Sequence, residues 1–222
     1  GRQVVYYDET DSTNNQAKAA GEKGEVHGTL FVADRQTAGK GRRGRGWESP
    51  SGNSVSMTIL LRPEIPPVKA PMLTLVMALA VADGIRDALG VDAGIKWPND
   101  IVLNKKKICG ILTEMSTEID YINYVVIGVG INVNQETFPD EIKETATSLK
   151  VETGKPVKRA GVIATVWKDL NKIMNSLCSR KICPESGRHM KRVWLIVTGM
   201  FGYWIRREHM KHMQKELTIP VS

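Results

Sequence analysis

The segment 39–46 reads GKGRRGRG and combines glycines with four cations. Glycine lets backbone amides approach an anion closely, and arginine supplies planar bidentate donors that suit phosphate or carboxylate. The spacing also matches the G-x-G-x-x-G pattern of dinucleotide-binding folds. In those folds the pattern stands at the start of a helix. Residues 47–52 contain two serines, a proline and a glycine and do not favour a helix, so the match to a dinucleotide-binding fold fails on its context. The segment is therefore a candidate anion-binding loop, the alternative being a solvated surface loop without a ligand.

Further polar groups follow predicted strands. In the segment 96–100 (KWPND), the Trp-Pro dipeptide predicts a rigid turn that displays Asn99 and Asp100, either to a polar substrate or cation or only to their own backbone. Lys107 stands at the entrance of an apolar strand and is directed at a developing negative charge or, as most lysines are, at solvent. The segment 128–134 (GVGINVN) has glycines at alternate positions, which indicates that a flat group such as a ring lies on that strand face.

Hydrophobic periodicity predicts the elements that must position these groups. A polar turn at 11–15 caps a first helix that ends at residue 20, and further helices span 71–89 and about 160–177. The predicted strands are 4–7, 28–33, 55–61, 94–97, 101–103, 107–113 and 121–133. Closely spaced strands with tight polar turns favour antiparallel pairing. The predicted fold is α+β, a mixed, largely antiparallel sheet with the helices packed over one face.

Composition describes a folded protein with a substantial core. Of 222 residues, 41 % are hydrophobic and 25 % are charged. The longest apolar run, 71–81, is shorter than the roughly 20 residues that cross a bilayer, and no signal segment opens the chain. Three cysteines at no framework spacing fit a reducing compartment. We therefore expect a cytoplasmic protein that does not enter a membrane.

The net charge of +7 is concentrated in residues 178–222, which carry 9 basic and 3 acidic residues, against 22 and 21 in residues 1–177. The overall basicity is therefore a property of the C-terminal tail, and it does not make the whole chain a nucleic-acid-binding protein. A nucleic-acid-binding module resting on the tail alone stays open as a lesser alternative.

Five segments, taken together and in order, closely resemble the biotin protein ligases. They are 11–14 (DSTN), 36–47 (QTAGKGRRGRGW), 96–100 (KWPND), 107–110 (KICG) and 128–134 (GVGINVN). The resemblance covers roughly residues 4–150 and implies the class II synthetase-like fold that biotin and lipoate ligases share. It implies an enzyme that joins biotin to ATP, with Mg²⁺, to give biotinyl-5′-AMP and pyrophosphate. The biotinyl group then passes to one lysine of the biotin carboxyl carrier domain of a carboxylase.

The resemblance also assigns site residues. The biotin set is Ser12, Thr13, Asn14, Gln36, Lys40, Gly41, Arg42, Lys107, Gly110 and Gly130. The nucleotide set is Arg42, Arg43, Trp47, Asn99 and Asn132, and the catalytic set is Arg42, Asp100 and Lys107. By the resemblance, the two glycines form the floor of the biotin slot and Lys107 bridges the biotin carboxylate and the α-phosphate. Asp100 either helps to hold Mg²⁺ or accepts the proton of the incoming lysine, and no metal site formed by protein ligands alone is expected.

Two features depart from the family pattern. Many bacterial relatives begin with a winged-helix DNA-binding domain, and we expect none in this chain and therefore no repressor function. Residues 178–222 do not show the sequence pattern of the small β-domain that usually ends these enzymes, so we expect a catalytic domain at 1–177 and a divergent or frame-shifted tail at 178–222. The cysteines and histidines of the tail fit no standard zinc spacing. A lipoate ligase, a catalytically impaired biotin-binding homologue and a homodimeric state stay open.

Overall fold

The computed structural model describes residues 3–177, and those up to Ile173 form one compact unit. The predicted divergent tail at 178–222, with its cysteines and histidines, lies outside the described residues. The domain boundary after residue 177 therefore stays a prediction.

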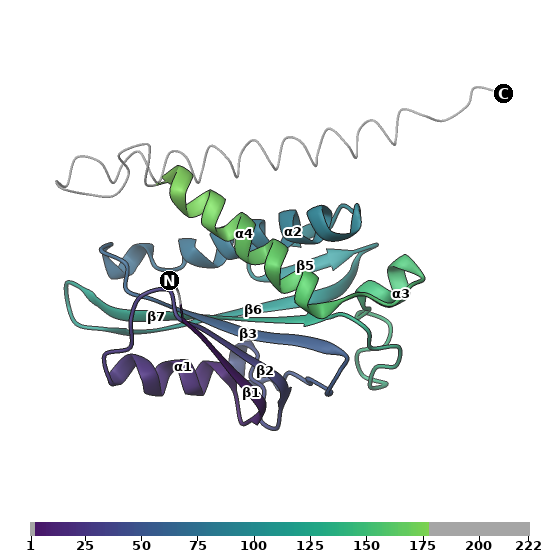
Figure 1. Ribbon diagram of the computed structural model, residues 1–222, viewed down its shortest axis with the longest axis horizontal. Helices are drawn as coiled ribbons and strands as arrows, with labels where there is room; N and C mark the ends of the chain where they lie inside the picture. The colour runs from purple at the N-terminus through teal and green to yellow at the C-terminus, as the bar shows by residue number, and fades with distance from the viewer. Residues whose placement is uncertain (1–2, 178–222) are drawn as a thin grey trace. The chain divides into compact units, whose positions relative to one another are not determined.

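The described residues form one seven-stranded sheet in the order β1-β2-β3-β7-β6-β5-β4 (Figure 1). The strands are β1 Val4–Thr10, β2 Leu30–Gln36, β3 Ser54–Leu61, β4 Gly94–Lys96, β5 Asp100–Leu103, β6 Lys106–Thr117 and β7 Ile122–Asn132. The β1–β2 pair is parallel and the other pairs are antiparallel. Each strand overlaps a predicted one, so the α+β class and the mixed, largely antiparallel sheet are confirmed.

Helices cover both faces of this sheet, and the prediction that they share one face is wrong. Helix α1 (Thr13–Glu22) lies on one face, whereas α2 (Met72–Leu89) and α4 (Arg159–Leu177) lie on the other (Figure 1). The reason is visible in β3, whose eight residues are all buried. A strand that is buried at both odd and even positions needs a covering layer on each side. The remaining helical segments are η1 Arg42–Gly44, η2 Pro67–Lys69 and α3 Leu149–Thr153.

The α2 region is the most apolar helical segment described. By length and composition, the helical segment 67–89 could cross a membrane, since a stretch of 18 residues within it has a mean hydropathy of 1.6, so the predicted apolar run of 71–81 was too short. Packing between the sheet and α4 explains this apolar character. At the α2–α4 crossing, a Cβ on Gly84 would lie 2.6 Å from the backbone nitrogen of Val166, so only glycine permits the approach. The helix ends as predicted, with Gly90 in the left-handed conformation at φ 70°.

The start of α1 differs from the predicted local cap. Ser12 occupies the N-cap position but its side chain makes no capping hydrogen bond. Instead, the amide N–H of Thr13 donates to Gln36 Oε1 at 2.8 Å, from the end of β2. Asp11 accepts hydrogen bonds from Asn15 and, at 3.0 Å, from Gln16. The polar turn is therefore tied to a neighbouring strand, which fixes its position on the sheet.

Candidate active site

The candidate site lies on the same face of the sheet as α1, beyond the N-terminus of that helix. In this region three strands align two rows of residues, all of them small or polar except Leu112. One row contains Thr58, Gly128 and Leu112, and the next contains Ser56, Gly130 and Gly110. The glycines of β6 and β7 leave bare backbone, on which side chains from other segments lie.

The first row holds the side chain of Asn14. A Cβ at Gly128 would lie 2.9 Å from Asn14 Cγ, so a glycine is required beneath this amide. Asn14 Nδ2 donates to Glu114 Oε2 at 2.8 Å and lies 3.4 Å from the carbonyl oxygen of Leu112. Asn14 Oδ1 accepts from Thr58 Oγ1 at 2.7 Å.

A buried polar network extends from Thr58 to the end of β2. Thr58 Oγ1 lies 2.8 Å from Thr13 Oγ1, which lies 3.0 Å from Gln36 Oε1. Gln36 Nε2 in turn donates to Ser49 Oγ at 3.2 Å, and Ser49 contacts Ser56 at 2.8 Å. Buried polar groups are costly unless they are hydrogen-bonded, so this network orients the Thr13 and Gln36 side chains for a ligand.

Sequence reasoning missed the supporting residues Ser49, Ser56, Thr58 and Glu114. A signal for two of them was present in β3, where Ser54, Ser56 and Thr58 alternate within a completely buried strand. Hydroxyls at every second position of such a strand indicate a polar patch on one of its faces. Ser49 and Glu114 had no comparable signal, because their roles depend on contacts across the sheet.

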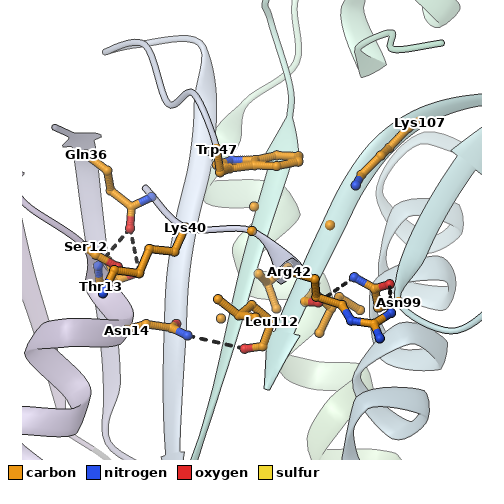
Figure 2. A pocket seen from close by; sticks show the side chains of 16 residues that line it. Ser12, Thr13, Asn14, Gln36, Lys40, Arg42, Trp47, Asn99, Lys107 and Leu112 are labelled. Carbon is orange, nitrogen blue, oxygen red and sulfur yellow. Dashed lines mark hydrogen bonds between the residues drawn. The ribbon is translucent and has the colours of Figure 1, made fainter. Parts of the chain in front are cut away.

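The second row lies beneath the indole of Trp47. A Cβ at Gly130 would lie 2.8 Å from Trp47 Cζ2, and one at Gly110 would lie 3.1 Å from Cζ3. The predicted flat group on this strand face is therefore, in this structure, a ring of the chain itself. Trp47 Nε1 is buried and has no hydrogen-bond partner among the described residues. Figure 2 shows the ring at the rim of a small cavity, which is described below, between Gln36 and Lys107.

The basic loop has local secondary structure. It contains the short 3₁₀ turn η1, with Arg43 in the left-handed region at φ 58°, and an isolated bridge joins Lys40 to Gly46. Lys40 Nζ donates to Asn15 Oδ1 at 2.8 Å. Arg42 donates to Asn99 Oδ1 at 2.9 Å, which draws the loop across the cavity (Figure 2).

Lys107 and Asp100 meet at the other end of the cavity. Lys107 Nζ forms an ion pair with Asp100 Oδ1 at 2.8 Å and lies 5.5 Å from the centre of the Trp47 ring, within cation–π range. Asn99 is held by two hydrogen bonds with the backbone of Ile111, both at 2.9 Å. The segment 96–100, which contains a cis Trp-Pro peptide bond, thus displays its amide and carboxylate beside the lysine.

Two cavities share the wall that these residues form. The first, of about 50 Å³, is lined by every residue of the biotin set, as Figure 2 shows for the labelled ones. The second, of about 790 Å³, is lined by every residue of the nucleotide set and by Asp100. Both cavities are lined by Gly41, Arg42, Trp47, Asn99 and Lys107. Since ligand pockets usually measure about 300–1,000 Å³, the loop and the Trp47 ring nearly fill the first cavity in this conformation.

Asp100 and Glu48 are the carboxylate side chains among the described residues that line the second cavity. Mg²⁺ is usually held by one or two carboxylates together with the phosphates of a substrate. Among the described residues, no group of three or more His, Cys, Asp and Glu could hold a metal ion by itself. The donor set therefore fits an Mg²⁺ that arrives with a nucleotide.

Comparison with known proteins identifies the family. The model of the biotin/lipoate A/B protein ligase family matches residues 6–132. The chain is 51 % identical over 165 residues to the bifunctional ligase/repressor BirA of Bacillus subtilis, covering 73 % of this chain and 51 % of that protein. It is 37 % identical over 153 residues to the biotin–[acetyl-CoA-carboxylase] ligase of Mycobacterium tuberculosis, covering 67 % of this chain and 55 % of that protein.

Solved structures agree with this result. A biotin protein ligase from Aquifex aeolicus, in complex with biotin and ATP, superposes with a TM-score of 0.68 at 34 % identity, covering 80 % of this chain and 72 % of that one. The chain spans about half the length of the two curated relatives named above. The family expected from the five sequence segments is thereby confirmed: the chain belongs to the biotin/lipoate A/B protein ligase family.

Proposed function

We propose that this protein is an ATP-dependent biotin protein ligase. It forms biotinyl-5′-AMP from biotin and ATP, and then transfers the biotinyl group to a lysine of a biotin carboxyl carrier domain. The observation that carries the proposal is the wall shared by the two cavities, where Arg42 and Lys107 face both. A reaction between an acid and a nucleotide needs a point at which the carboxylate meets the α-phosphate, with cations beside it.

In the first step, a carboxylate oxygen of biotin attacks the α-phosphorus of ATP. The bond from that phosphorus to the oxygen bridging to the β-phosphate breaks, and pyrophosphate leaves. Negative charge builds on the phosphoryl oxygens and on the leaving group, and Lys107 and Arg42 stabilise it best when water is excluded. Mg²⁺ bound to ATP adds positive charge at the phosphates.

In the second step, the amine of the carrier lysine attacks the acyl carbonyl and AMP leaves. Lys107 polarises the carbonyl, and the amine loses a proton. Asp100 is close enough to Lys107 to influence this step, either as the proton acceptor or as a ligand of Mg²⁺. The ordered basic loop opens to admit substrates and closes to protect the adenylate from water.

The names of relatives support the substrates. The Aquifex structure is a complex with biotin and ATP, and the mycobacterial relative is named for acetyl-CoA carboxylase. We extend both to this chain as a proposal, together with a cytoplasmic location and a carrier domain as the protein partner. Homodimerisation stays a prediction.

Pyrophosphate release by the purified full chain with ATP and Mg²⁺ tests the proposal. We expect release that requires biotin, that lipoate does not replace, and that is followed by biotinylation of an added carrier domain. We expect Lys107→Ala to slow release strongly, whereas Lys143→Ala, which breaks a solvent-exposed ion pair with Asp140, should leave it unchanged. Release with lipoate but not with biotin would instead identify a lipoate ligase.

A further inference from the structure

Glu114 lies on β6 outside the lining of the biotin cavity, yet it is bonded to a residue that forms it. Its Oε2 accepts from Asn14 Nδ2 at 2.8 Å, and its Oε1 pairs with Lys18 Nζ at 2.9 Å. Partial burial raises the pKa of the Glu114 carboxyl, but the hydrogen bonds from Asn14 and Lys18 outweigh this and hold it below its usual value. Glu114 is therefore ionised at neutral pH, and an ionised carboxylate can only accept hydrogen bonds.

This carboxylate fixes which way the Asn14 amide points. The atom of Asn14 beside Glu114 must be the donor Nδ2, so the acceptor Oδ1 is turned to Thr58. The Leu112 carbonyl, 3.4 Å from Nδ2, favours the same orientation. The single hydroxyl proton of Thr58 is then committed to Asn14.

The chain of contacts that runs from Asn14 to Gln36 has one proton fewer than it has contacts. Three oxygen–oxygen contacts follow one another: Asn14–Thr58 at 2.7 Å, Thr58–Thr13 at 2.8 Å and Thr13–Gln36 at 3.0 Å. Gln36 presents its Oε1 there, because that atom accepts the Thr13 backbone N–H at 2.8 Å. Two hydroxyls supply two protons for three contacts, so acceptor lone pairs are in excess at Thr13 and Gln36.

We propose that Glu114 is a positioning residue that sets this hydrogen-bond polarity and makes the buried end of the cavity selective for ligands that bring N–H donors. The inference rests on the proposed function and deepens it. The cyclic urea of biotin carries two N–H groups, whereas the dithiolane ring of lipoate carries none. Glu114 thus contributes to the choice between the two acids through Asn14.

The test compares the single variant Lys18→Met with the double variant Lys18→Met/Glu114→Gln. Both lack the ion pair between Lys18 and Glu114, so they differ only in the charge and hydrogen-bonding of the side chain at position 114. With glutamine at position 114, the Asn14 amide can turn over, donate to Thr58 and supply the missing proton. The network is then satisfied without a ligand. We expect biotin affinity, measured by calorimetry on the full chain, to fall about tenfold, which corresponds to the loss of roughly one hydrogen bond. The thermal midpoint of the ligand-free double variant is expected to be equal to or above that of Lys18→Met.

The opposite signs for affinity and stability separate this role from a structural one. Unchanged biotin affinity in the double variant, or a loss of affinity with an equal loss of stability, would overturn the inference. If the wild-type chain does not bind biotin, the proposed function fails, and the inference is decided in the ligand-free protein by nuclear magnetic resonance. One side-chain amide proton of Asn14 should be strongly deshielded in Lys18→Met and not in the double variant. The same Asn14 spectrum in both proteins would refute the polarity argument.

Discussion

Replacing Gly128 with alanine tests the seating of Asn14 on the sheet. A Cβ at this position would lie 2.9 Å from Asn14 Cγ and 3.1 Å from Nδ2, closer than real Cβ atoms normally approach. Asn14 is 4 % exposed and hydrogen-bonded on both sides, so it has little room to move aside. The added methyl group must therefore displace the amide from Thr58, Glu114 or both.

The magnitude follows from two terms. Overpacking a well-packed site costs about 1–3 kcal/mol. Each hydrogen bond lost adds about 0.5–1.5 kcal/mol. We expect Gly128→Ala to lower the free energy of unfolding by roughly 2–3 kcal/mol. Since the neighbouring Thr13 lines the biotin cavity, we also expect biotin affinity to fall at least about tenfold, for each factor of ten is about 1.4 kcal/mol.

Urea denaturation and calorimetric titration with biotin measure the two effects. Gly94→Ala is the matched control, because a Cβ there would meet Val102 at ordinary distances, 3.5 Å from Cγ2 and 3.9 Å from the carbonyl oxygen, and we expect little change. Adding Asn14→Ala to Gly128→Ala removes the clash, so the double variant should be more stable than the sum of the single changes. Strict additivity, or biotin binding by Gly128→Ala equal to that of the wild type, would refute the reasoning.

Three further outcomes are expected. Lys107→Met should slow biotinyl-5′-AMP formation about 10²–10³-fold, the usual effect of removing one preorganised donor to transition-state charge, and a rate within threefold of wild type would contradict its role. Hydrogen bonds, first that from Asn15, hold the pKa of Asp11 in the folded protein at about 2, below its pKa in the unfolded chain. The ionised carboxylate therefore stabilises the fold at pH values above the unfolded-state pKa, and this stabilisation is lost as the pH falls toward 2. Urea denaturation at a series of pH values should show a weaker loss of stability toward low pH in Asp11→Asn. Complete burial raises the pKa of the Cys109 thiol, so in a Cys178→Ser/Cys183→Ser background a thiol reagent should modify it only at the unfolding rate, and fast labelling of folded protein would count against this packing.

Local patterns were enough to predict most of the sheet and several of the residues that line the two cavities. Alternating glycines at 128 and 130 predicted that flat groups lie on β7, and the structure places the Asn14 amide and the Trp47 ring there. The basic loop was predicted to bind an anion and Lys107 to face either a developing negative charge or solvent, and residues of the loop and Lys107 line both cavities. These signals were readable because each depends on residue type and spacing within one segment.

Features that depend on register across strands could not be read in the same way. The pairing that sets Thr58 beside Gly128 decides that Thr58 supports Asn14, and no single segment contains this information. Likewise, Gln36 replaces the predicted local cap of α1 because β2 ends beside the turn. The placement of helices on both faces followed from the complete burial of β3, which the sequence shows only as an apolar strand with hydroxyls.

The most direct test of the account is whether biotinyl-5′-AMP forms at the wall between the two cavities. The purified full chain is incubated with biotin, ATP and Mg²⁺, and the small molecules are released and identified by mass spectrometry. The account predicts biotinyl-5′-AMP in the wild type and its near absence in Lys107→Met. A folded chain that binds both biotin and ATP yet forms no biotinyl-5′-AMP would contradict it.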